Sequence, residues 1–127
     1  MAQYLDDQAI ESLYTLYRRG MELLEDGSFE EATVPLKEAA RQAPEKSSVR
    51  EALGRALFRT RHYAEAAAEF EAVVETHPVN DYAHFCLGRS LENTGRRAEA
   101  RRHAALAACM RPDRADYRAF RERLQTA

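Results

Sequence analysis

Apolar residues of fixed size recur every 34 positions along this 127-residue chain. Leu23, Leu57 and Leu91 keep this interval. Three sets of small or rigid residues keep it as well: Gly20, Gly54 and Gly88; Ala32, Ala66 and Ala100; Pro44, Pro78 and Pro112. Strand-like alternation does not persist anywhere, and the helix formers Ala, Glu, Arg and Leu dominate the chain. The pattern predicts an all-helical protein built from an internal repeat.

Short polar segments divide each repeat into two predicted helices. They lie at residues 25–28, 60–62 and 93–95. Gly27 and Gly95 suit the left-handed residue that closes a helix, because glycine has no Cβ to clash there. Proline in a helix interior removes a backbone hydrogen bond, so the three evenly spaced prolines predict helix ends. Each repeat is therefore predicted to be a helix, a turn, a second helix and a stop.

The packing positions of this unit resemble those of the tetratricopeptide repeat, a helix–turn–helix motif of 34 residues. The Leu-Gly pair of that motif stands at Leu53-Gly54 and Leu87-Gly88, and the other signature positions match in size over 102 residues. The resemblance implies one all-α domain over residues 1–127, a right-handed α-α superhelix, or solenoid. Its expected parts are an extension of the first helix at 1–12, repeats at 13–46, 47–80 and 81–114, and a capping helix at 115–127.

The two ends of the predicted stack differ from its middle. Arg19 replaces the leucine of the Leu-Gly pair in the first repeat, as a terminal unit allows. Tyr117, Phe120 and Leu124 share one side of the last predicted helix. That side can cover the final repeat, while the arginines on the outer side keep the helix in contact with water.

In the resembling family, the first helix of each repeat lines a concave groove that binds partners. Arg and Tyr are enriched at binding hot spots, and Arg can hold a carboxylate with two hydrogen bonds. The resemblance therefore implies a non-enzymatic protein–protein interaction adaptor, whose ligand is an acidic and partly apolar peptide or helix. The expected partner-binding residues are Tyr14, Tyr17, Arg18, Met21 and Leu24 in the first repeat, Glu51, Arg55, Phe58 and Arg59 in the second, and Tyr82, Phe85 and Arg89 in the third.

The first repeat has more apolar surface than one hairpin needs. Tyr14, Tyr17, Met21 and Leu24 form one stripe at helical spacing, and a second stripe one residue over suits the core of the repeat: Leu13, Leu16, Gly20 and Leu23. Either residues 1–12 cover the first stripe, through Tyr4, Leu5 or Ile10, or the stripe is an exposed contact. An exposed stripe could bind a partner or drive a homodimer, which is the alternative function.

Two further alternatives concern the groove itself. Arg55 and Arg89 could pair internally with Glu51 and Glu92 rather than with a ligand. Some family members bind the C-terminal carboxylate of a chaperone through a Lys/Asn clamp. Tyr17 and Met21 occupy the matching positions of the first repeat here, so this specific activity is not expected.

Charge is distributed unevenly, although the net charge is only −2. Residues 1–45 hold ten acidic and four basic residues, whereas residues 96–127 hold four acidic and nine basic residues. A solvated helix surface accounts for this, but nucleic-acid binding through the basic end is a further alternative. The arginines concerned are Arg96, Arg97, Arg101, Arg102, Arg111, Arg114, Arg118 and Arg121.

Composition and motifs exclude several classes of function. The chain has no phosphate-binding loop, nucleophile elbow or zinc-protease motif, so we expect neither catalysis nor a cofactor. Cys86 and Cys109 are too few for a disulfide framework and are predicted to be buried. The histidines have no metal-ligand spacing, so no metal is expected. The first residues lack a signal-peptide pattern, and no apolar run spans a membrane, which predicts a cytoplasmic protein. The seventeen Arg and two Lys suggest a bacterial source, such as an actinobacterium.

Overall fold

The computed structural model describes the backbone of residues 2–126 and the side chains of residues 12–126. This part of the chain is all-α, as the sequence predicts, and contains no strand. None of its helices is both long and apolar enough to cross a membrane. The helices are α1 (Ala2–Glu25), α2 (Phe29–Gln42), α3 (Ser47–Arg59), α4 (Tyr63–Thr76), α5 (Asp81–Asn93), α6 (Arg97–Met110) and α7 (Ala115–Thr126).

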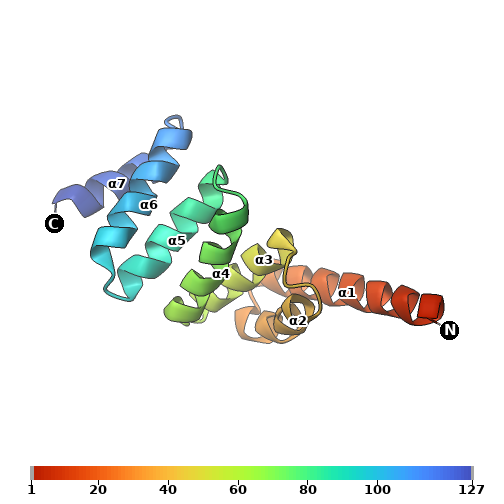
Figure 1. Cartoon of the computed structure of the whole chain (residues 1–127). Coiled ribbons are helices and arrows are strands. Elements are labelled where there is room, and N and C mark those ends of the chain that lie inside the picture. The colour runs from red at the N-terminus through yellow and green to blue at the C-terminus, as the bar shows by residue number, and fades with distance from the viewer. Residues whose placement is uncertain (1, 127) are drawn as a thin grey trace.

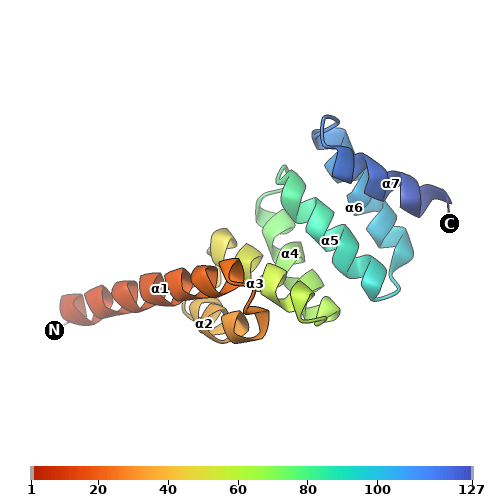
Figure 2. The ribbon, with the colours of Figure 1, turned by 180° about the vertical axis from the view of Figure 1, so that it is seen from behind.

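The helices pair into hairpins that stack in chain order. Each helix packs mainly against the one before and the one after it, and α3 also contacts α1 and α5 along the stack. Figure 1 shows this row running from α1 at one end to α7 at the other, with the two termini far apart. From behind, α1, α3 and α5 lie on the near side of α2, α4 and α6 (Figure 2). The architecture is a superhelical solenoid with two layers of helices.

Small residues set how closely the two helices of a hairpin approach. A Cβ added at Gly54 would lie 2.8 Å from the ring of Phe70, and one at Gly20 would lie 2.5 Å from the side chain of Leu36. Both distances are below ordinary van der Waals contact. Ala66 of α4 is completely buried. The repeated Gly and Ala positions therefore act as the sequence predicts: they let large side chains of the facing helix fill the space.

The hairpin turns use a residue with a left-handed backbone conformation. Gly27 and Gly95 have φ values of 79° and 80°, in line with the sequence-based expectation. Arg61 takes the same role in the middle hairpin with φ 65°, although it carries a Cβ. The backbone N–H of the following residue, His62, then donates to the carbonyl of Leu57 at 2.8 Å, which closes α3. The middle turn is therefore the strained one of the three.

The three evenly spaced prolines follow helix ends as predicted, but a fourth proline does not, and the prediction for the two cysteines is wrong. Pro35 lies inside α2 and is buried, so not every proline of this chain marks a helix end. It has no N–H to offer the carbonyl of Glu31, one turn earlier. Cys109 is exposed and Cys86 only partly buried. The buried face of α6 carries Ala100, Ala104 and Ala107, and Cys109 lies off that face.

The two ends of the solenoid are built differently. Helix α7 packs on α6 and buries Tyr117, Phe120 and Leu124, as the sequence predicts for a cap. At the other end, residues 2–12 continue α1 as one helix rather than folding back. They therefore cannot cover the stripe that begins at Tyr14. The side chains of Tyr4, Leu5 and Ile10 lie outside the described residues.

The two apolar stripes of α1 are not divided cleanly into one for the groove and one for the core, because Leu24 of the first stripe and Leu23 of the second both contact the core. Leu24, assigned to the groove, is buried, while Leu16 and Leu23, assigned to the core, are only half-buried. Gly20 alone of the second stripe is buried, under Leu36. The reason is position in the stack: in the described chain no hairpin precedes α1, so its outer side has no neighbour to pack against.

Candidate functional site

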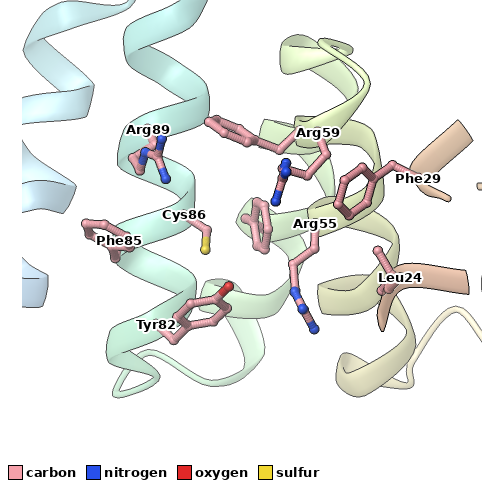
Figure 3. Close-up of a pocket in the computed structure, with 10 residues that line it drawn as sticks. Leu24, Phe29, Arg55, Arg59, Tyr82, Phe85, Cys86 and Arg89 are labelled. Carbon is pink, nitrogen blue, oxygen red and sulfur yellow. The ribbon is translucent and has the colours of Figure 1, made fainter. Parts of the chain in front are cut away.

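A pocket of about 330 Å³ opens between the first five helices. Because the hairpins stack with a curve, side chains from the ends of α1 and α3 meet those along α5. Figure 3 shows guanidinium groups of α3 and α5 entering a space walled by aromatic rings. The lining residues are Leu24, Phe29, Arg55, Phe58, Arg59, Phe70, Tyr82, Phe85, Cys86 and Arg89.

Aromatic rings hold two of the arginines in place. The guanidinium carbon of Arg59 lies 4.1 Å from the ring centroid of Phe29. That of Arg89 lies 4.8 Å from the centroid of Phe58 and 5.8 Å from that of Phe85. Such cation–π contacts fix the orientation of a guanidinium while leaving its N–H groups available. The pocket therefore presents ordered donors beside an apolar wall.

No carboxylate in the described part of the chain neutralises these arginines by an ion pair. Glu92, one candidate partner, is held instead by Arg123 of α7, with Nη2 3.0 Å from Oε1, and this pairing lowers the pKa of the Glu92 carboxyl. Glu51, the other candidate, accepts a hydrogen bond from the Asn80 side chain at 3.3 Å. The alternative in which Arg55 and Arg89 pair with these two glutamates is therefore wrong.

The remaining polar groups of the pocket carry no charge near neutral pH. Burial raises the pKa of the Cys86 thiol to about 12. Burial, reinforced by the neighbouring thiol, raises the pKa of the Tyr82 hydroxyl to about 12 as well. Both groups stay protonated, so the pocket has a positive charge from arginine alone. It suits an anionic ligand that also has apolar groups.

The structure brings seven of the twelve expected partner-binding residues together around this pocket: Leu24, Arg55, Phe58, Arg59, Tyr82, Phe85 and Arg89. Their role in binding is taken up under the proposed function. Leu24, Phe58 and Phe85 differ from the expectation in one respect, because all three also pack into or against the core. Phe85 contacts the rings of Tyr117 and Phe120, with centroids 4.8 Å and 5.4 Å apart.

The other five expected residues lie outside the pocket. Tyr14 is 65% exposed, and Arg18 lies near its ring and pairs with Glu22 in solvent. Tyr17 and Met21 pack partly against the core, and Glu51 is occupied by Asn80. For Tyr14, the physical reason is its distance from the pocket along α1. Ten residues of helix separate Tyr14 from Leu24, about 15 Å along the axis, so the stripe leaves the pocket.

Three pocket residues are absent from the sequence-based set. Phe29 and Phe70 come from second helices, α2 and α4, and Cys86 comes from α5. The assumption that first helices alone line the groove excluded both phenylalanines. Phe29 stands directly after the first turn, where a large side chain can reach over the hairpin end, and this position could have revealed it. Phe70 forms the fully buried floor beside Gly54.

Several arginines of the basic C-terminal end are engaged in contacts within the protein. Arg111 binds Asp113 and Arg114 binds Asp116, each by two hydrogen bonds of 2.8 and 3.0 Å. Arg101 donates to the carbonyl of Leu124 at 3.0 Å, and α7 is thereby tied to α6. Much of the excess of arginine at this end is therefore used in contacts that hold the cap in place. They weaken the nucleic-acid alternative, which needs arginines free to reach phosphates.

Comparison with known proteins identifies the family to which the repeat belongs. A sequence profile described as tetratricopeptide repeat matches residues 17–68 and 51–119, which together span most of the chain. The chain belongs to the tetratricopeptide repeat family. Members of this family are typically protein–protein interaction modules and are generally non-enzymatic adaptors.

Solved tetratricopeptide repeat structures share the fold over most of this chain. The first such domain of Spaghetti, bound to an HSP90 peptide, has a TM-score of 0.84 at 15% identity, covering 91% of this chain and 92% of that one. The C-terminal domain of a putative FK506-binding protein from Plasmodium falciparum reaches 0.86 at 21% identity, covering 95% and 91%. At these identities the similarity concerns the fold alone.

A bacterial structure matches over part of its own length. MamA of Desulfovibrio magneticus RS-1 has a TM-score of 0.86 at 19% identity over 90% of this chain, and the match spans 64% of the MamA chain. A search of curated proteins gave no significant match. The family and fold are thus known, whereas the partner has to be inferred from the pocket.

Proposed function

We propose that residues 1–127 act as one tetratricopeptide repeat domain, a non-enzymatic adaptor that binds an acidic, partly apolar peptide or helix of a partner protein. The proposed binding site is the pocket between the first five helices that Arg55, Arg59 and Arg89 line. One observation supports this most strongly: Arg55, Arg59 and Arg89 converge there with no ion-pair partner among the described residues. A cluster of like charges is unfavourable by itself, and an anionic ligand relieves it.

The aromatic walls of the pocket indicate that the ligand also carries apolar groups. Phe29, Phe58 and Tyr82 line the same space as the arginines, so a ligand that buries apolar groups there gains hydrophobic free energy as well. The peptide bound to the Spaghetti domain, SRMEEVD, has this composition of acids and apolar residues. It supports a peptide ligand for this chain. Tyr17 and Met21 stand where a Lys/Asn clamp would be, so recognition should depend on side chains rather than on a terminal carboxylate.

The proposal is tested with a fluorescein-labelled helical peptide that carries glutamates on one side and leucines on the other. A matched peptide has glutamine in place of every glutamate. We expect fluorescence anisotropy to show binding of the acidic peptide, weakened by added salt, and at least about tenfold weaker binding of the neutral one. The Arg55→Glu/Arg89→Glu variant should lose binding to the same extent.

The control variant is Lys46→Glu/Arg118→Glu, which changes the net charge equally at exposed residues outside the pocket. If both double variants bind the acidic peptide alike, long-range charge explains the binding and the pocket assignment is wrong. Labelled single-stranded oligonucleotides serve as the second probe. Binding at low salt that survives the Arg55→Glu/Arg89→Glu change would favour the nucleic-acid alternative.

A further inference from the structure

A second cavity, of about 470 Å³, lies at the N-terminal end of the solenoid, between α1 and α2. Its apolar lining consists of Leu16 and Leu23 from α1 and Val34 and Pro35 from α2. Val34 is 71% exposed, although it is one of the large apolar residues of the chain. The opposite end of the solenoid has α7 packed over it. In the described chain nothing packs over this end, and we call it the end face.

Opposite charges stand on opposite sides of the end face. Arg19 of α1 and Glu31 of α2 both line the cavity, and both are exposed. Neither belongs to an ion pair among the described residues, in contrast to Glu38 on the same rim, which binds Arg41. The end face therefore has an apolar centre, a positive edge on one helix and a negative edge on the other.

This arrangement is complementary to itself. A two-fold rotation about an axis through the cavity places α1 of one copy against α2 of the other. Arg19 of each copy then faces Glu31 of its partner, so the charge pair forms twice. The exposed Val34 of each copy meets the apolar lining of the other. A translation or a head-to-tail contact would not match both edges at once.

We propose that the end face binds the same face of a second copy, and that the protein is a two-fold homodimer in solution. The contact uses the stripe with Leu16 and Leu23, not the one with Tyr14, which the sequence favours for a dimer. It goes beyond the proposed function, because the pocket around Arg55 stays open in each copy. The dimer presents two pockets, and a partner with two acidic segments gains affinity from the link between them.

Sedimentation equilibrium of the full chain tests the dimer. We expect a concentration-dependent mass that rises from 14.5 kDa to twice that value and no further, within protein concentrations up to about 100 μM. The Val34→Glu variant should stay monomeric, because its dimer would bury two carboxylates at the contact. Val79→Glu is the control: Val79 is 81% exposed in the turn before α5, far from the end face. It should dimerise like the unchanged chain.

Charge reversal tests the pairing of Arg19 with Glu31 across the contact. Arg19→Glu and Glu31→Arg should each weaken the dimer at least about fivefold, since each places two pairs of like charges at the contact. The double variant Arg19→Glu/Glu31→Arg restores both pairs within a single sequence, so its dimer should return to near the original strength. Restoration of this kind is expected from a self-complementary contact and not from a fold defect. Circular dichroism confirms that each variant is folded.

Each other outcome contradicts the proposal. A chain that stays monomeric at about 100 μM, masses that grow beyond the dimer, or a Val34→Glu variant that still dimerises would all overturn it. So would a double charge reversal that fails to restore association. Measuring peptide binding by the Val34→Glu variant keeps the two proposals separate. If the end face does not dimerise, the pocket can still bind the peptide. If the pocket does not bind the peptide, the mass of the dimer is unchanged.

Discussion

His84 of α5 and His103 of α6 form a hydrogen bond through their Nδ1 atoms, which lie 2.9 Å apart in the protein interior. Nε2 of His84 lies 2.8 Å from the carbonyl oxygen of Pro78, which can only accept. His84 therefore carries its proton on Nε2 and accepts at Nδ1, and His103 donates from its Nδ1. The hydrogen bond forms with both rings neutral. A proton added at Nε2 of His103 leaves its Nδ1 donor in place, but it puts a charge on a ring that is buried in the interior.

This pair predicts a loss of stability in mild acid. Burial is the main cause that lowers the pKa of His103 from 6.5 to about 4, with His84 and Arg102 adding to it and Glu99 opposing it. Between these two pH values the unfolded chain binds more protons than the folded chain, so acidification favours unfolding. The free energy of unfolding should fall by roughly 2 to 3 kcal/mol between pH 6.5 and 4 from this residue.

Urea unfolding at several pH values measures the effect. The control is His103→Gln, which keeps a side-chain donor toward His84 but does not titrate. Its free energy of unfolding should depend less steeply on pH over this window. Equal pH dependence of the two proteins would show that His103 takes up its proton in the folded state without cost.

The strained turn predicts a stabilising substitution. Arg61 has φ 65°, a conformation that costs about 1 kcal/mol for a residue with a Cβ, while glycine adopts it freely. Arg61→Gly should raise the free energy of unfolding by about 0.5 to 1 kcal/mol. The reverse change at the matching turn, Gly95→Arg, should lower it by a similar amount. Thermal and urea unfolding report both, and shifts of the same sign would contradict the backbone argument.

The two cysteines should react with thiol reagents at different rates. The thiolate is the reactive form, and the Cys86 thiol, with its pKa raised to about 12 by burial, is almost entirely protonated at pH 8. Cys109 is exposed, so a disulfide reagent should modify one thiol per folded chain quickly and the second slowly. The Cys109→Ser variant isolates the slow reaction, and Cys86→Ser the fast one. A bound acidic peptide should slow Cys86 further, since this residue lines the pocket.

A side-chain hydrogen bond from α7 to α5 should contribute to stability. The hydroxyl of Tyr117 donates to Asp81 Oδ2 at 2.8 Å. Tyr117→Phe keeps the buried ring and removes this bond to a charged acceptor, so it should lower the free energy of unfolding by about 1 to 2 kcal/mol. Tyr63→Phe is the matched control, because Tyr63 packs edge-on against Phe58 and makes no such bond. If the two variants lose equal stability, the Asp81 contact contributes nothing of its own.

The stack itself could be predicted from sequence because its constraints are local and repeat. Gly54 and Ala66 must be small wherever two helices of a hairpin meet, and Gly95 must adopt a left-handed backbone. Such requirements act within one unit and appear in every unit. Arg61 and Pro35 escaped the prediction because each breaks a local rule: Arg61 adopts a left-handed backbone although it carries a Cβ, and Pro35 lies inside a helix.

The pocket could be predicted only in part. Arg55, Arg89 and Tyr82 were placed correctly beside one another, because their repeat positions fix the side of the helix on which they lie. Whether the arginines are free depended on Arg123, which lies 31 residues beyond Glu92 and takes that carboxylate. No spacing within a repeat encodes this contact.

The sequence by itself determined the repeat, the order of helices and the side of helices α3 to α7 that faces the core, since helical periodicity and the steric limits of Gly, Ala and Pro act over a few residues. Only the tertiary structure decided which apolar stripe of α1 lies at the open end and which side chains meet in the pocket. Those outcomes depend on what lies next to each helix in the stack. Leu23 is half-buried whereas Leu57 and Leu91 are buried, because a hairpin precedes each of the latter two.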